Sequence, residues 1–133
     1  MSFVVDASVA ICWVMPDETD PRAEAAHEWA LREQPITPGI WWYEARNILI
    51  QCERRGRINA FQAEAFLNWL ASLVQPMGSF PESGETLRLA RQHRLTVYDA
   101  AYLALAIEER LPLATLDRAL EAAARAEGVE IVE

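Results

Sequence analysis

Four acidic residues lie where predicted strands end or predicted helices begin: Asp6, Glu44, Asp99 and Asp117. Carboxylates that converge in a partly dry crevice repel one another and cannot all stay ionised unaided. Divalent cations relieve that repulsion, and a ligand set of oxygen atoms without His or Cys favours Mg²⁺ or Mn²⁺. Such an ion can lower the pKa of a bound water and so supply a nucleophile at neutral pH. The four residues therefore predict an acidic metal site.

Each of the four residues also has a purely structural explanation. Asp6 can begin a turn, Asp99 and Asp117 can cap helices, and Glu44 can sit at the border of a buried stripe. The sequence leaves both explanations open for each residue taken singly. The set as a whole favours a site, because three of its members belong at a sheet edge or at helix starts that should face the same end.

Alternating apolar runs and amphipathic segments predict the elements that position these acids. The expected strands are Phe3–Val5, Val74–Met77, Leu111–Leu116 and Val129–Val132. The expected helices run from Ser8 as N-cap to Met15, Pro21 to Arg32, Ile40 to Arg55, Asn59 to Leu73, Glu82 or Ser83 to His93, Val97 to Arg110, and Arg118 to Glu127. Pro35 and Pro38 bracket a segment that we expect to be a connector.

Short apolar strands between helices indicate an α/β fold, with a central, mainly parallel sheet between two layers of helices. The 133 residues fit a single domain, residues 1–133. In such sheets, sites form at the carboxyl ends of the strands. Asp6 and Asp117 follow two of the expected strands, so both belong at that edge. Asp99 lies at the start of a helix, Val97–Arg110, that is apolar on nearly every side and should be buried.

Aromatic residues raise a second question. In the third helix an apolar stripe runs through Trp41, Ala45, Ile48, Leu49 and Cys52, and Glu44 lies at its edge. The run Trp41-Trp42-Tyr43 can belong to the core, to a dimer interface or to a surface that stacks an unpaired base. The first two alternatives are favoured. In the next helix we expect inward-facing apolar residues at these positions: Phe61, Phe66, Leu67, Trp69 and Leu70.

The composition sets limits on location and partners. Cys12 and Cys52 are too few for a disulfide framework or a zinc site, and no basic leader or long apolar run is present. A cytoplasmic location without membrane contact is the default expectation. The net charge of −8 predicts weak non-specific binding to nucleic acid, although all twelve basic residues are Arg, which binds phosphate in a bidentate way.

Several stretches together resemble the PIN-domain family, and their length and order resemble its VapC-type toxins. They are Val4-Val5-Asp6-Ala7-Ser8, Glu44 with Asn47, Thr96 to Ala106 around Asp99, and Leu113-Ala114-Thr115-Leu116-Asp117. The resemblance covers nearly the whole chain. It implies a PIN-like three-layer fold and endonucleolytic cleavage of RNA with Mg²⁺ or Mn²⁺.

The same resemblance implies roles for individual residues and partners. Asp6 and Asp99 would be the main metal ligands, and Glu44 and Asp117 would complete the site. Ser8, and more weakly Thr115, would orient the first carboxylate or contact phosphate. The family also implies a homodimer and a cognate antitoxin that occludes the pocket.

Other classes fit the sequence less well. A haloacid-dehalogenase-type phosphatase needs a second Asp where Ser8 stands, and a receiver domain or a P-loop needs a Lys that the chain lacks. His27 and His93 have no partner pattern and are interpreted as structural or surface residues. The remaining alternative is a non-catalytic PIN-like module that binds protein. Four mutually repelling acids argue against it.

Overall fold

The computed structural model describes residues 1–77 and 85–133, and within these ranges four parallel strands form one sheet. The strands are β1 (Ser2–Val5), β2 (Gln34–Pro38), β3 (Gln75–Met77) and β4 (Leu113–Ala114), in the order β3-β2-β1-β4. β1 is central, and Val4 pairs with Ile36 on one side and Leu113 on the other. The expectation of a mainly parallel sheet is confirmed.

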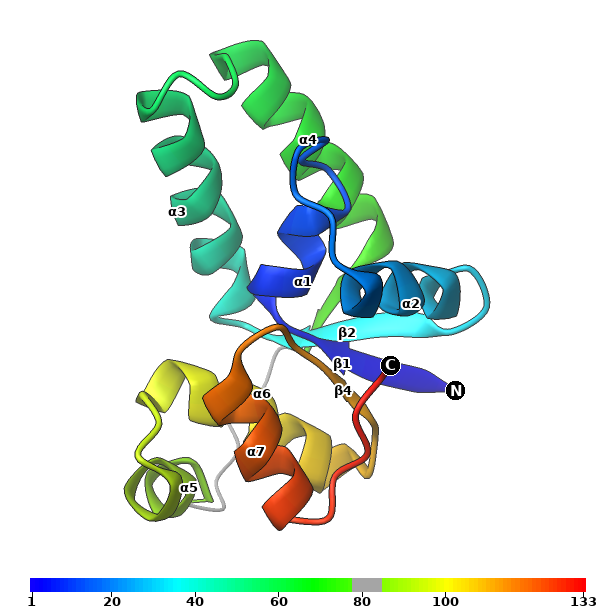
Figure 1. The fold of residues 1–133 in the computed structure, drawn as a ribbon, viewed down its shortest axis with the longest axis vertical. Helices are drawn as coiled ribbons and strands as arrows, with labels where there is room; N and C mark the ends of the chain where they lie inside the picture. Colours follow the sequence, from blue (N-terminus) through cyan, green and yellow to red (C-terminus); the bar gives the residue numbers. More distant parts are fainter. Residues whose placement is uncertain (78–84) are drawn as a thin grey trace.

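Helices cover both faces of this sheet (Figure 1). On one side lie α1 (Ala7–Cys12), α2 (Pro21–Ala30), α3 (Trp41–Arg54) and α4 (Ala60–Leu73). On the other lie α5 (Glu85–His93), α6 (Val97–Glu109) and α7 (Arg118–Ala126). The predicted α/β/α arrangement of three layers is therefore correct. The expected start of α5 at Glu82 or Ser83 lies outside the described residues. Among the described helices, none is long and apolar enough to cross a membrane.

The core forms where β1 meets the helices on either side of it. Phe3, Val4 and Val5 are fully buried, as a central strand covered on both faces requires. The predicted burial of α6 is confirmed from Ala100 through Ala106, where one residue is only partly buried. α6 packs against β1, β2 and β4. Its first turn is thereby held beside the carboxyl end of β1.

The expected connector at Pro35–Pro38 is wrong, because this segment belongs to β2. The two prolines occupy the second and the last position of the strand. The residues between them, Ile36 and Thr37, keep their N–H groups and are buried. The prolines suggest a loop, because proline cannot donate to a ladder and is rare inside sheets. Pairing with β1 and β3 on both sides outweighs that preference here.

The strands near the C-terminus are shorter than expected. The run Leu111–Leu116 contributes only Leu113–Ala114 to the sheet, and Val129–Val132 contributes a single parallel bridge between Ile131 and Leu113. The chain leaves the sheet after Ala114, where the Thr115 hydroxyl donates to Asp6 and accepts from the backbone N–H of Asp117. This departure directs both side chains to the carboxyl edge.

Two expectations about helices also need correction. Ser8 is not the N-cap of α1; Asp6 is, because the helix begins at Ala7, and the helix ends at Cys12 rather than Met15. In α4, Phe61 and Trp69 do not face inward: they are 82% and 42% exposed. α4 packs mainly on α3, so only Leu70 of this helix is fully enclosed.

Candidate active site

The carboxylate of Asp6 lies at the point where β1 ends and α1 begins. Its Oδ1 accepts a hydrogen bond of 3.1 Å from the backbone N–H of Val9, which makes Asp6 the N-cap of α1. Its own backbone N–H donates to the carbonyl of Ala114 on β4. The side chain is 5% exposed. A buried strand on one side and a helix start on the other therefore fix this carboxylate in place.

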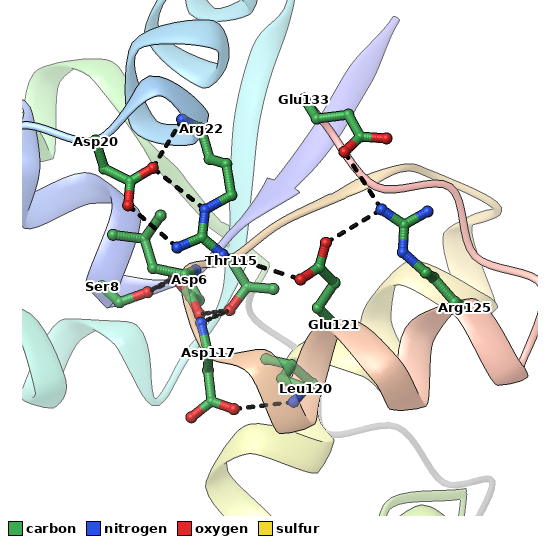
Figure 2. A network of polar contacts seen from close by, with 11 residues as sticks. Asp6, Ser8, Asp20, Arg22, Thr115, Asp117, Leu120, Glu121, Arg125 and Glu133 are labelled. Carbon is green, nitrogen blue, oxygen red and sulfur yellow. Dashed lines mark hydrogen bonds and ion pairs between the residues drawn. The ribbon is translucent and has the colours of Figure 1, made fainter.

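Two hydroxyl groups hold Asp6 further (Figure 2). Ser8 Oγ donates to Asp6 Oδ1 at 2.6 Å, and Thr115 Oγ1 donates to Asp6 Oδ2. The same hydroxyl oxygens accept from the backbone: Ser8 from Leu116 at 3.2 Å and Thr115 from Asp117 at 3.0 Å. Ser8 and Thr115 therefore lie beside Asp6, each bonded to one of its carboxylate oxygens.

Burial raises the pKa of Asp6 from 3.8 to about 6. The hydrogen bonds from Ser8, Thr115 and the Val9 N–H favour the ionised form and lower the pKa, but by less than burial raises it. The charge of Asp99 raises the pKa of Asp6 further. Three donors therefore favour the charged form of Asp6, while burial and the charge of Asp99 disfavour it.

Asp99 occupies the first turn of α6, where Thr96 is the N-cap. The Thr96 hydroxyl accepts from the Asp99 backbone N–H at 3.0 Å, as the sequence predicts. Partial burial raises the pKa of the Asp99 carboxyl, and the neighbouring charge of Asp117 raises it further. Asp99 is thus the acid through which the others interact, because its charge also raises the pKa of Asp6 and of Glu44.

Glu44 reaches the site from the other side of the sheet, in the first turn of α3. Its Oε1 accepts a hydrogen bond of 2.5 Å from the hydroxyl of Tyr102 on α6. Partial burial raises the pKa of Glu44, the bond from Tyr102 lowers it, and Asp99 raises it. Tyr102 is absent from the sequence-based site. The sequence does contain a cue for Tyr102, because a buried tyrosine one turn after Asp99 needs a hydrogen-bond partner for its hydroxyl.

Asp117 has the structural role that the sequence leaves open for it. Its Oδ1 accepts a bond of 2.9 Å from the backbone N–H of Leu120, so it is the N-cap of α7. The residue is exposed, unlike Asp6. Its backbone bond to Thr115 Oγ1 nevertheless attaches it to the hydrogen-bond network of Asp6 (Figure 2).

A second element of the network lies between α2 and α7 and has no counterpart in the sequence analysis. The Arg22 guanidinium donates to both carboxylate oxygens of Asp20, at 3.2 and 3.1 Å. It also contacts Glu121 of α7 at 3.9 Å (Figure 2). Arg22 thus joins the two helices that flank the loop carrying Thr115.

The donor chemistry of the four acids suits Mg²⁺ or Mn²⁺, since all of the side-chain ligands are oxygen atoms. The charge of Asp99 raises the pKa of Asp6 and of Glu44, and the charge of Asp117 raises that of Asp99; a cation would offset these effects. Within residues 1–77 and 85–133, however, no three acidic, His or Cys side chains stand close enough to hold one ion. Joint binding of one ion would therefore require side-chain rearrangement; Glu44 and Asp99 are half-buried, and Asp117 is exposed.

The aromatic run at the start of α3 divides between core and surface. Trp41 is 1% exposed and belongs to the core, as the apolar stripe predicts. Trp42 and Tyr43 are 46% and 67% exposed. The core interpretation is therefore wrong for these two residues.

The chain resembles known proteins in both sequence and fold. Residues 3–126 match the model of the PIN domain family. Ribonuclease VapC3 of Pyrobaculum aerophilum is 36% identical over 123 residues, which are 90% of this chain and 92% of that protein.

Solved structures support the fold. The P. aerophilum protein PAE2754 superposes with a TM-score of 0.72 at 32% identity, over 92% of this chain and 84% of that one. Two structures of lower identity share the fold. FitAcB of Neisseria gonorrhoeae has a TM-score of 0.66 at 18% identity, over 98% and 96% of the two chains. VapC20 of Mycobacterium tuberculosis is described as a toxin that cleaves the sarcin–ricin loop. It has a TM-score of 0.62 at 16% identity, over 92% of this chain and 95% of that one.

Proposed function

Because the chain belongs to the PIN-domain family and has a VapC ribonuclease among its relatives, we propose that it is a Mg²⁺- or Mn²⁺-dependent endoribonuclease that acts as the toxin of a toxin–antitoxin pair. The observation that carries this proposal is the environment of Asp6. A buried carboxylate with three hydrogen-bond donors and a raised pKa has a neighbouring carboxylate, Asp99, but no bonded cation among the described residues. That combination is typical of a metal ligand.

The four acids have different parts in this proposal. Asp6 and Asp99 are the main ligands, since a buried strand end and the first turn of a buried helix hold them in place. Glu44 and Asp117 complete the site, and Ser8 and Thr115 orient Asp6. When bound, the metal ion lowers the pKa of a water and offsets charge on the phosphate. The four acids hold the ion, and Ser8 and Thr115 orient Asp6, whose burial limits its contact with bulk water.

The partners in this proposal are RNA and a cognate antitoxin. The antitoxin presents Arg or Lys to the acidic pocket and so replaces the charge of the metal. The net charge of −8 and the raised pKa values of Asp6 and Asp99 support a basic partner segment. The proposal includes a homodimer, which the family resemblance implies.

A non-catalytic binding module is the alternative, and the energetics of Asp6 argue against it. The bond from Thr115 to Asp6 and the bond from the Leu116 N–H to Ser8 join the end of β1 to the turn after β4, which is useful for any scaffold. An asparagine could still accept from Ser8 and from the Val9 N–H through its one oxygen, without the cost of a buried charge. The presence of Asp at this position is therefore better explained by chemistry.

The first test is cleavage by the purified protein. With Mg²⁺ or Mn²⁺ it should cut single-stranded or looped RNA, and chelation should stop the reaction. Asp6→Asn and Asp99→Asn should each abolish cleavage while the fold is kept. Glu24→Gln, at an exposed position in the first turn of α2, is a control that changes the net charge equally. Full activity in both site variants would refute the nuclease assignment.

The toxin role needs a separate test. Expression of the chain alone should slow the growth of its natural host, and expression together with the antitoxin encoded beside it should restore growth. If the active enzyme leaves growth and RNA pools unchanged, the toxin role is wrong although the nuclease role stands.

A further inference from the structure

Arg22 is a basic residue at the carboxyl edge of the sheet. It is the second residue of α2, which packs against β4. Because only residues 31–33 separate α2 from the amino end of β2, the first turn of α2 lies toward the opposite, carboxyl end of the strands. A cation in the first turn of a helix is disfavoured by the helix dipole. The position of Arg22 therefore calls for a role other than stabilising α2.

The guanidinium of Arg22 is oriented by one carboxylate and has one open edge. Its Nε and Nη2 donate to the two carboxylate oxygens of Asp20, which takes two of the five N–H donors. Nη1 makes no hydrogen bond to any described residue, because its contact with Glu121 Oε2 is 3.9 Å long. The side chain is 31% exposed. The end of the fork, formed by Nη1 and Nη2, is therefore open to a further acceptor.

This guanidinium lies close to Asp6. In Figure 2 it is drawn beside Thr115, whose hydroxyl is bonded to Asp6. The hydrogen bonds to Asp20 raise the pKa of Arg22 most. The charges of Asp20, Glu121 and Asp6 raise it further. Arg22 is not among the larger influences on the pKa of Asp6, and no ion pair joins these two described residues. Their charges are therefore neighbours that do not touch.

We propose that Arg22 binds a phosphate of the RNA backbone beside Asp6, through the open end of its guanidinium. This proposal rests on the proposed ribonuclease function and adds a substrate-binding residue to it. Arginine binds phosphate through two parallel N–H donors, and such charge-assisted bonds are stronger than neutral ones. Asp20 orients the guanidinium before RNA arrives, so that little side-chain freedom is lost on binding.

The charge of the chain makes this contact valuable. A chain with a net charge of −8 gains little from general attraction to phosphate, so binding depends on individual cations that are correctly placed. The rival explanation is structural, since Arg22 also joins α2 to α7 through Glu121. That ion pair is long and partly exposed, and ion pairs of this kind contribute little to stability.

Arg22→Met tests the phosphate contact and keeps the N-cap of α2, because the backbone N–H that donates to Asp20 remains. KM for a single-stranded RNA should rise about tenfold and kcat should stay within about threefold, since one hydrogen-bonded charge pair with bound RNA is lost. Arg22→Lys should recover only part of the affinity, because it keeps the charge and loses the fork. Arg125→Met is the matched control. Arg125 contacts the same Glu121, at 3.1 Å, farther along α7, and its loss should leave KM within about twofold (Figure 2).

Glu121→Ala separates phosphate binding from the structural bridge. If Arg22 acts by joining α2 to α7, removal of Glu121 should raise KM as much as Arg22→Met does. If Arg22 binds phosphate, KM should not rise, because a competing carboxylate has been removed from the open end of the guanidinium. Alanine also suits the interior of a helix. An equal rise in KM in Glu121→Ala and Arg22→Met therefore overturns the proposal.

A binding measurement separates this proposal from the nuclease assignment. In EDTA, the anisotropy of a fluorescein-labelled single-stranded RNA gives its affinity at several NaCl concentrations. Arg22→Met should bind more weakly than the wild type, and its slope of log affinity against log salt should be shallower by about 0.7, the value for one phosphate on a single strand. That result in a protein that cleaves nothing would overturn only the proposed function. Equal affinities and slopes, or cleavage with an unchanged KM in Arg22→Met, overturn the phosphate contact.

Discussion

The Tyr102 hydroxyl donates a hydrogen bond of 2.5 Å to Glu44, a residue 58 positions away in the sequence. This bond connects α3 to α6, and α6 carries Asp99. Burial of the phenol raises the pKa of Tyr102, and the charge of Glu44 raises it further, so the tyrosine is a neutral donor over the whole physiological range. Glu44 is thereby held at a defined distance from the Asp99 helix before any metal arrives.

Tyr102→Phe should weaken this arrangement without disturbing the packing of the ring. Glu44 loses the bond that lowers its pKa, so its pKa rises and it ionises at a higher pH. Because only the carboxylate binds a metal, the acid limb of the cleavage profile should move to higher pH. Stability should fall by about 1 kcal/mol, the ordinary net value of one hydrogen bond. Rates against pH and urea unfolding measure both effects. An unchanged profile would mean that Glu44 takes no part in metal binding.

Asp6→Asn should stabilise the metal-free protein in a pH-dependent way. Folding raises the pKa of Asp6 from 3.8 to about 6, so the folded state holds this proton more tightly than the unfolded state. The associated stability is fully present below pH 3.8 and is lost as the pH rises through about 6. The free energy of unfolding falls by at most about 3 kcal/mol, because a pKa difference of one corresponds to about 1.4 kcal/mol.

Urea unfolding in EDTA at pH 4 and pH 8 tests this expectation. The asparagine variant should match the wild type near pH 4 and exceed it at pH 8. Added Mn²⁺ should stabilise the wild type more than the variant. If the variant is the less stable protein at pH 8, the bonds to Ser8 and Thr115 are worth more than the burial of the charge costs.

Local patterns in the sequence predict most of the fold. They also predict that Asp6, Asp99 and Asp117 lie at strand ends or helix starts near the carboxyl edge of the sheet. Asp6 follows a fully buried β-branched run, and Thr96 caps a helix that starts just before Asp99. Both signals are short-range. β2 is missed because Pro35 and Pro38 contradict the local preference for a strand, and only pairing on both sides overcomes it. The same holds for the bond from Tyr102 to Glu44, since nothing local relates positions so far apart.

Helical geometry separates Trp41 from the two aromatic residues that follow it. Successive helical residues are about 100° apart, so three in a row cannot all face a core on one side. Trp41 belongs to the stripe that continues through Ala45, and Trp42 and Tyr43 must then point elsewhere. Burial of Trp41 therefore predicts exposure of its neighbours. The sequence still does not tell whether an exposed ring meets solvent, protein or RNA.

Thr115→Val should impair the site by removing one of the two hydroxyls that hold Asp6. The isosteric valine keeps the buried volume, but the pKa of Asp6 should rise, since the bond from Thr115 lowers it. The cleavage rate should fall about tenfold near neutral pH, because a hydrogen bond to a charged group contributes ~1.5 kcal/mol or more. The loss should shrink at high pH, where Asp6 is ionised in both proteins.

Thr37→Val is the matched control for that substitution. Thr37 is a fully buried residue at the carboxyl end of β2, and its hydroxyl has no hydrogen-bond partner in the described structure. Its replacement should leave cleavage unchanged and should not reduce stability, because no bond is lost. Equal losses in both variants would assign the effect of Thr115→Val to packing.

The four acids should contribute unequally to metal binding, and Asp117 should contribute least. Asp6 is buried and bonded to two hydroxyls, and Asp99 stands on a buried helix. Such preorganisation is what a direct ligand requires. Asp117 is exposed, and its Oδ1 is engaged by the Leu120 N–H as the N-cap of α7. We expect it to contact the metal through water, or only with a second ion and substrate bound.

Asp117→Asn keeps the capping bond, since asparagine caps helices as well as aspartate does. It should therefore lower the cleavage rate less than Asp99→Asn does and leave the first, tight binding of Mn²⁺ nearly unchanged. Asp117→Ala should in addition lose about 1 kcal/mol of stability with the cap. Calorimetric titration of Mn²⁺ into the two asparagine variants, with cleavage rates measured alongside, compares them directly. Loss of the first binding event in Asp117→Asn would place this residue among the direct ligands, and the N-cap bond to Leu120 would then have to break whenever metal binds.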